Sequence, residues 1–357
     1  MTFDTFKIRH YFKTISNFDT NVVFIDTVKK ALIVSSNTEA MMLSLDIKTD
    51  KEDNQSLFVF EKQDFLHAIK YINCITIDDE YNYKGEGVLG KFKKDSNEYT
   101  SEIVQLTCDC FNHKEKFELI KTFEGNLLQQ LLKSFIFVAP DSTRELEQYV
   151  YIKDNKIFST SDTRVYLNTL CEQVNNVIIN GKAIKFLSSL TDNGFSLYKD
   201  NKNIMIENSD LMLFFTGDTI EYPPVLEQKF EEKYKSLFSD VSVTFNNKQE
   251  VVDKLDYMTH FSKELPNNFI DIEIDKTNNK VIFSALENKI EVTDVTINNI
   301  DCETLNFKFN QSQFLNIIKT LSKEQFTIYL NKDESRKLVV ISFNNNEEIA
   351  IVAKINY

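Results

Sequence analysis

The chain of 357 residues repeats one strand pattern three times, and this repetition limits its possible folds more than any other feature. Each copy has an alternating apolar strand, a turn rich in Asp, Lys or Asn, and a second apolar strand that ends near a serine. The copies are Val22–Ser36, Tyr149–Ser161 and Phe269–Ala285. Their serines stand at positions 35, 159 and 284, so the interval between copies is nearly constant.

A second pattern lies between these copies, and it predicts a short strand that runs into an amphipathic helix. Its three copies are Ser56–Ile72, Asn175–Leu190 and Leu305–Leu321. In each copy the last apolar strand residue precedes the first apolar helix residue by the same offset, in the pairs Phe60 and Phe65, Ile179 and Ile184, Phe309 and Phe314. Helical spacing also precedes each serine pattern, at Phe6–Ile15, Asn126–Phe137 and Lys248–Phe261.

These patterns predict an α+β fold of three tandem domains, because short alternating strands outnumber the two helices of each third. Each domain is expected to be a two-fold repeat of one helix followed by antiparallel strands. The predicted domains span residues 1–120, 121–239 and 240–357, near the usual domain size. A linker is expected at Tyr222–Ser239, which carries two of the four prolines and a charged run.

Composition excludes several classes of protein. The chain has 7 glycines and neither the GxxxxGK[ST] nor the GxGxxG motif, which argues against a nucleotide-binding P-loop or dinucleotide fold. Five scattered cysteines do not form a disulfide framework. No apolar run is long enough for a membrane span and the N-terminus lacks a signal sequence, so we expect a cytoplasmic protein. The net charge of −13, taken alone, argues against nucleic acid.

Three segments carry a resemblance to a known family. Asn126–Leu167 (NLLQQLLKSFIFVAPDSTRELEQYVYIKDNKIFSTSDTRVYL) and Phe214–Pro224 (FFTGDTIEYPP), together with Leu305–Leu330, resemble the bacterial sliding clamp, the β subunit of DNA polymerase III, in a divergent or phage-encoded form. The resemblance is weak in the first third. The family's Thr-Asp-Gly-His-Arg-Leu stretch reads Ser161 to Tyr166 here, without its Gly and His, and the tail IVAKINY lacks the family's Met-Pro.

The resemblance implies a non-enzymatic processivity factor without cofactor or metal. Such a protein forms a head-to-tail homodimeric ring, whose helices line the interior and whose sheets form the outside. It encircles duplex DNA without sequence preference, is loaded by a clamp loader ATPase, and tethers a DNA polymerase and other partners at the replication site of the nucleoid. An acidic exterior with basic inner helices would reconcile this function with the net charge.

The ring arrangement predicts that basic residues on the helices face DNA phosphates. The candidates are Lys7, Arg9, Lys13, Lys62, Lys70, Lys133, Lys182, Lys185, Lys248, Lys254, Lys263, Lys319 and Lys323. The alternative is that lysine is simply frequent in this chain and favourable in helices.

The resemblance also implies an apolar pocket for a short partner peptide, between the second and third domains. Its predicted residues are Ser161, Thr163, Arg164, Val165, Tyr166, Ile351, Ala353, Ile355 and Tyr357. The alternative for the C-terminal residues is a strand that closes the sheet.

The remaining motifs indicate neither a metal site nor a catalytic site. Cys108, Cys110 and His113 lack the usual zinc spacing and a fourth ligand, so buried thiols are the better interpretation. Asp78, Asp79 and Glu80 indicate a solvated loop more than a cation site. The alternative to a sliding clamp is a β-rich structural or adhesion protein of a phage or bacterium. An enzyme is a further alternative, but it would need a catalytic site that the sequence does not show.

Overall fold

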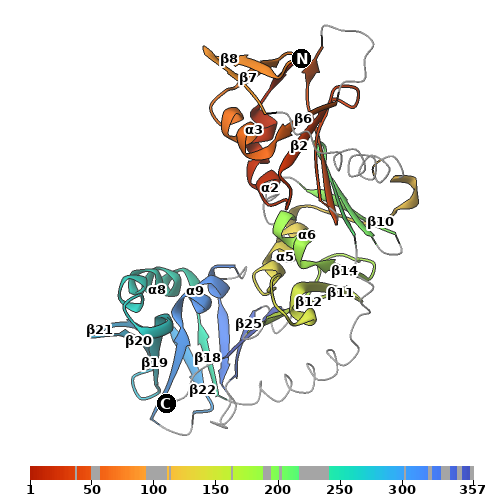
Figure 1. Cartoon of the computed structure of the whole chain (residues 1–357). Coiled ribbons are helices and arrows are strands. Elements are labelled where there is room, and N and C mark those ends of the chain that lie inside the picture. Colours follow the sequence, from red (N-terminus) through yellow and green to blue (C-terminus); the bar gives the residue numbers. More distant parts are fainter. Residues whose placement is uncertain are drawn as a thin grey trace. The chain divides into compact units, whose positions relative to one another are not determined.

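The computed structural model describes residues 1–36, 38–49, 57–93, 111, 114–161, 164–187, 194–200, 203–216, 241–300, 303–320, 324–330, 338–343 and 348–353 (Figure 1). The chain forms two compact units, one of Met1–Leu128 with Ile179–Ile220 and the other of Gln129–Ile178 with Glu221–Tyr357. The middle third therefore contributes to both units. The division into three domains stays a prediction, and the expected linker lies outside the described residues.

The first unit contains two antiparallel sheets. One has the strand order β5-β1-β7-β8-β9 and the other β10-β15-β16-β17-β4-β3-β2-β6. The strands are β1 Thr2–Asp4, β2 Val22–Asp26, β3 Ala31–Ser35, β4 Glu39–Ser44, β5 Ile47–Lys48, β6 Leu57–Glu61, β7 Cys74–Ile77, β8 Asn82–Gly85, β9 Val88–Lys91, β10 Glu118–Phe123, β15 Phe195–Lys199, β16 Asn203–Glu207 and β17 Leu211–Thr216. The helices are α1 Phe6–His10, α2 Phe12–Ser16, α3 Lys62–Ile69 and α6 Gly181–Leu187, with a 3₁₀ turn at Lys114–Lys116.

The second unit also contains two sheets, with the strand orders β14-β11-β12-β13-β26-β25-β24-β18-β22 and β21-β20-β19-β23. The strands are β11 Tyr149–Lys153, β12 Lys156–Ser161, β13 Arg164–Thr169, β14 Val177–Asn180, which ends in the first unit, β18 Val241–Phe245, β19 Phe269–Asp275, β20 Lys280–Ala285, β21 Asn288–Val292, β22 Val295–Asn298, β23 Thr304–Asn310, β24 Phe326–Leu330, β25 Leu338–Phe343 and β26 Glu348–Ala353. The helices are α5 Gly125–Phe135, which begins in the first unit, α8 Lys248–Ser262 and α9 Gln311–Thr320, with 3₁₀ turns at Glu145–Gln148 and Pro266–Asn268.

The predicted repeats are confirmed in both units. The three serine patterns form the antiparallel hairpins β2-β3, β11-β12 and β19-β20. Each short strand runs directly into its helix, as β6 into α3, β14 into α6 and β23 into α9. The first predicted helix differs, because it breaks at Tyr11 into α1 and α2. The backbone of Tyr11 leaves helical geometry at ψ 15°, while its side chain stays buried and its hydroxyl accepts a hydrogen bond from Asn208 at 3.3 Å.

The constant offset between strand and helix has a packing reason. It stacks Phe60 on Phe65 and Phe309 on Phe314, in both cases with ring centroids 4.9 Å apart. All four rings are fully buried. The same offset buries the aliphatic pair Ile179 and Ile184 in the middle third. Each repeat therefore closes its core by placing the end of a strand against the first turn of the next helix.

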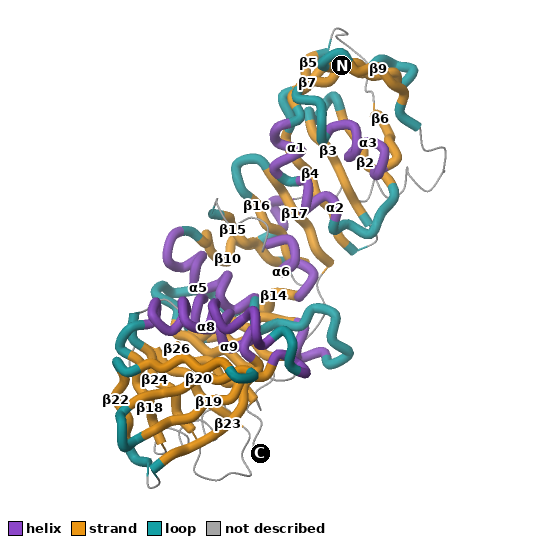
Figure 2. The backbone as a smooth tube through the Cα atoms, turned by 90° about the vertical axis from the view of Figure 1, so that its left-hand side faces the viewer, coloured by secondary structure: helices purple, strands orange, loops and turns teal. Residues whose placement is uncertain are grey.

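Helices α8 and α9 lie side by side on one side of their sheets (Figures 1 and 2), and a buried amide joins them. The side chain of Gln311 donates hydrogen bonds to the Leu255 carbonyl at 2.7 Å and the Thr259 hydroxyl at 2.8 Å. It also accepts one from the hydroxyl of Ser262 at 3.3 Å. Gln311 has no exposed surface, so these contacts are shielded from water.

Replacing Gln311 with leucine is expected to lower the free energy of unfolding by about 1–3 kcal/mol. The apolar side chain keeps most of the volume but removes three hydrogen bonds to α8, whose polar groups then keep only their bonds within the helix. Denaturant unfolding measures the change. Gln313→Leu, two residues along the same helix, is the matched control and should change stability by less than about 0.5 kcal/mol. Equal effects of the two substitutions would contradict the role assigned to Gln311.

Candidate functional site

The structure brings several residues of the predicted peptide pocket together in the second unit. Strand β13 pairs antiparallel with β26, with Arg164 opposite Val352 and Val165 opposite Ile351. Ile351 and Ala353 thus belong to a strand beside β13, and the pocket itself stays a prediction. The side chain of Arg164 donates a hydrogen bond to the Ser161 hydroxyl at 3.2 Å. Thr163, Ile355 and Tyr357 lie outside the described residues.

Tyr166 differs from the prediction, because it is part of the core and not of a surface. It has no exposed area, and its ring stacks on Phe137 with centroids 4.9 Å apart. Its hydroxyl donates a hydrogen bond to the Glu348 carboxylate at 2.8 Å. Burial, with the neighbouring charge of Glu348, raises the pKa of Tyr166 well above its usual value. Tyr166 is thus closed to a peptide in this structure, and Ser161, which is 8% exposed, is nearly so.

The predicted DNA-facing residues occupy three kinds of position. Lys13, Lys70, Lys185, Lys263 and Lys319 are exposed on helices or at their ends, whereas Lys7, Arg9, Lys248 and Lys254 are half-buried. Lys62 and Lys133 are largely buried. Lys323 and the side chain of Lys182 lie outside the described part of the chain.

Among the exposed and half-buried lysines that the structure describes, several are paired with carboxylates. Lys7 pairs with Asp210 at 2.8 Å and Lys319 with Asp256 at 2.7 Å, while Lys254 pairs with Glu250 one helical turn away. The hydrogen bond to Asp210 raises the pKa of Lys7 above its ordinary value. These pairs neutralise part of the positive charge that the helices present, so lysine count overstates the charge available to phosphates.

Two of the predicted DNA contacts are corrected by the structure. Lys62 is 7% exposed, and its ammonium group donates a hydrogen bond to the Phe18 carbonyl at 2.7 Å. Burial lowers the pKa of Lys62. The side chain of Lys133 is 11% exposed and lies 3.2 Å from the Glu348 carboxylate, whose side chain is 2% exposed. Both lysines hold elements of the fold together and do not face solvent, which helical periodicity alone did not reveal.

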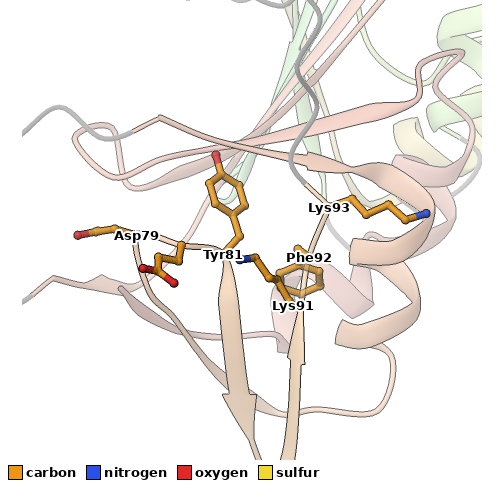
Figure 3. Close-up of a pocket in the computed structure, with 6 residues that line it drawn as sticks. Asp79, Tyr81, Lys91, Phe92 and Lys93 are labelled. Carbon is orange, nitrogen blue, oxygen red and sulfur yellow. The ribbon is translucent and has the colours of Figure 1, made fainter.

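A pocket of about 790 Å³ in the first unit was not predicted from the sequence. Figure 3 shows its lining, which comes from residues 79–81, just before β8, and from residues 91–93, at the end of β9 and after it. The lining residues are Asp79, Glu80, Tyr81, Lys91, Phe92 and Lys93. None of these six lining residues is a serine, cysteine or histidine.

Neither a metal centre nor a membrane helix stands out in the described residues. Within the described ranges, no group of three His, Cys, Asp or Glu side chains could hold a metal ion. The proposed buried thiols Cys108 and Cys110, with His113, fall outside these ranges. No described helix is long and apolar enough to cross a bilayer.

Comparison with known proteins finds similarity in structure alone. No protein-family model and no curated protein matches the sequence. The DNA polymerase III β subunit of Thermotoga maritima has a TM-score of 0.71 at 13% identity, over 100% of this chain and 99% of its own. The DNA polymerase sliding clamp of Bacillus subtilis has a TM-score of 0.71 at 14% identity, over 100% and 98%.

A third similar structure is the Helicobacter pylori β clamp bound to a DNA ligase peptide. It has a TM-score of 0.68 at 16% identity, and the match covers 100% of both chains. These likenesses extend over the first third of the chain, where the sequence resemblance was weak. The chain therefore has, over its full length, the fold of the DNA polymerase III β subunit, the bacterial sliding clamp.

Proposed function

We propose that the protein is a DNA sliding clamp, a non-enzymatic processivity factor that encircles duplex DNA. The observation that carries this proposal is the match over the whole chain to three sliding-clamp structures. The recurring helix-plus-strands unit supports it independently, because the amino-acid sequence alone repeats this unit in every third of the chain. A fold alone does not define a function, so the proposal needs its own test.

In this function two chains close head to tail into a ring. Exposed lysines on the helices, such as Lys13, Lys70 and Lys263, supply weak contacts to phosphates. Weak contacts suffice because a closed ring stays on DNA by topology, and they permit sliding because phosphates are the same at every base pair. The ion pairs of Lys7, Lys254 and Lys319 reduce the positive charge that the helices present to the phosphates. A lower charge weakens binding to DNA and favours sliding along it.

The proposed partner site lies along β13 and β26, and continues into the C-terminal residues. The Helicobacter pylori β clamp is known with a DNA ligase peptide, which supports peptide partners for this fold. An apolar cleft would accept the apolar anchors of a short extended peptide. The proposed partners are a DNA polymerase, other proteins that carry such a peptide, and a clamp loader ATPase. The proposed place of action is the replication site in the cytoplasm.

The function is tested by loading the protein onto primed circular DNA with a clamp loader and ATP. A clamp should raise polymerase processivity on the circle, stay bound after the loader is removed, and leave when the circle is linearised. Its mass in solution should be near twice 41.7 kDa. A monomer or a filament that does not enhance synthesis would favour the structural or adhesion alternative.

Deleting residues 355–357 is expected to weaken binding of a polymerase-derived peptide by about 10–30-fold, since the lost apolar groups would be central anchors of the cleft. Fluorescence anisotropy with a labelled peptide measures the affinity. Sedimentation should still show the dimer, because the predicted dimer contacts belong to the first and third domains. Unchanged peptide affinity would indicate that the C-terminal residues only close the sheet.

A further inference from the structure

The pairing of β13 with β26 joins two parts of the chain that no turn connects. Tyr166 on β13 and Glu348 on β26 are 182 residues apart. In a hairpin the turn sets which residues lie opposite each other, but here the side chains must do so. The neighbouring pairs β12-β13 and β25-β26 are consecutive in the chain, so only short connections separate their strands.

The sequence of β26 specifies its register weakly. After Glu348 it reads Ile-Ala-Ile-Val-Ala, with an apolar residue at every position. Alternation of apolar and polar residues normally tells a strand which face is buried and which partner residue lies opposite. A shift of two residues along β13 would again place apolar residues beside apolar residues. Hydrophobic burial alone therefore distinguishes poorly between the observed register and its neighbours.

Glu348 breaks this degeneracy, because its carboxylate meets partners from two other elements. It lies opposite Asn168 on β13 and is 1% exposed. Its Oε1 accepts a hydrogen bond from the Tyr166 hydroxyl at 2.8 Å and lies 3.2 Å from the ammonium group of Lys133 on α5. The Asn168 amide donates in turn to the Tyr166 hydroxyl at 3.0 Å. In a register shifted by two residues, Glu348 would lose these partners while still buried.

The energetics of buried charge make such a cluster a determinant of specificity more than of stability. A buried ion pair adds little net stability compared with apolar residues of the same volume, because both charges are desolvated. Separating the partners is costly, at about 3–5 kcal/mol, because one charge remains buried without compensation. The cluster therefore raises the free energy of a wrong register and hardly changes the free energy of the observed one. A buried polar residue fixes the register of a coiled coil in the same way.

We propose that Glu348 is a positioning residue that sets the register between β13 and β26, through Lys133, Tyr166 and Asn168. The register determines which part of β26 lies beside Val165 at the proposed peptide cleft. A shift of two residues would move these strands by roughly 7 Å relative to each other. The effect on peptide binding rests on the proposed function, whereas the effect on register does not.

The test measures register by disulfide cross-linking in the full chain, with all five native cysteines replaced by serine or alanine. The pair Val165→Cys and Ile351→Cys reports the observed register. Val165→Cys with Ile349→Cys, or with Ala353→Cys, reports shifts of two residues in either direction. In the parent chain the observed pair should cross-link at least tenfold more than either shifted pair.

The decisive variant replaces the ion pair by apolar residues, Lys133→Met with Glu348→Leu. It should keep or raise the unfolding midpoint, while a shifted pair cross-links to within threefold of the observed pair. Tyr166→Phe keeps the volume and the ion pair, and should raise shifted cross-linking by about threefold. Lys319→Met with Asp256→Asn removes an exposed pair of the same unit and should change neither measurement.

Cross-linking confined to the observed pair in both the apolar variant and Tyr166→Phe would overturn the proposal. If the apolar variant does not fold, Tyr166→Phe decides alone. Because the assay uses neither DNA nor a partner, a failed proposal about register is distinguishable from a failed proposal about clamp function. If both hold, the apolar variant should also lose affinity for a polymerase-derived peptide in proportion to the share of the shifted register, by up to about fourfold, while remaining a dimer.

Discussion

Reversing Lys13, Lys70, Lys185 and Lys263 together to glutamate is expected to shorten retention on nicked circular DNA by about 100-fold or more. All four side chains are exposed on helices or at their ends. In a dimer the change replaces eight positive charges by negative ones, so attraction to the phosphates becomes repulsion. The dependence of retention on salt concentration should flatten as well, because fewer counterions are released on binding.

A matched control distinguishes location from net charge. Lys48, Lys84, Lys276 and Lys289 are exposed on strands or turns, and their reversal to glutamate changes the net charge by the same amount. This control should leave retention within about twofold of the parent at physiological salt, where charges beyond about 8 Å are largely screened. If both variants lose retention equally, the helices are not the surface that meets DNA. Loading should be verified for each variant before the DNA is washed.

Replacing Phe60 with alanine is expected to lower the free energy of unfolding by about 3–5 kcal/mol. Phe60 is fully buried where β6 meets α3. Its ring contacts Phe65 at 4.9 Å, Phe92 at 5.2 Å and Tyr81 at 5.3 Å between centroids. Removing it opens a cavity among rigid rings that cannot close around the loss. Guanidinium unfolding followed by circular dichroism measures the change.

Phe6→Ala is the control, because Phe6 is 68% exposed on α1 in the same unit. It should change the free energy of unfolding by less than about 0.5 kcal/mol. The equivalent substitution Phe309→Ala, in the second unit, should cost as much as Phe60→Ala, since its ring is also fully buried and stacks on a helix. A small effect at Phe60 would mean that the repeated offset is not what closes each core.

The local elements could be predicted from the sequence because their signals are local. The offset from Phe60 to Phe65 predicted the strand-to-helix junction, and the serine hairpins appeared at each expected place. The break at Tyr11 was missed, since the apolar spacing of α1 and α2 runs through it without interruption. Backbone geometry at one residue does not alter a pattern that extends over ten.

The candidate sites stay predictions, and the structure corrects the positions of individual residues in them. The family resemblance grouped Arg164, Val165 and Ile351 in one peptide pocket, which stays a prediction, whereas the structure shows that their strands pair. The burial of Lys62 and Lys133 was not, because a lysine on an amphipathic helix usually indicates the solvated face. One signal could have revealed the pair. Glu348 is the single charged residue of an otherwise apolar strand, and a buried carboxylate requires a cation or strong donors.

The sequence by itself determined the three-fold repetition, the alternation of strands with two helices in each third, and the absence of nucleotide-binding motifs. These are properties of neighbouring residues, so periodicity and spacing report them. Only the tertiary structure decided that the middle third is shared between two units, that β13 joins β26, and that Lys133 neutralises Glu348. Such contacts connect residues far apart in the chain. Their choice depends on burial and charge compensation, which no local pattern records.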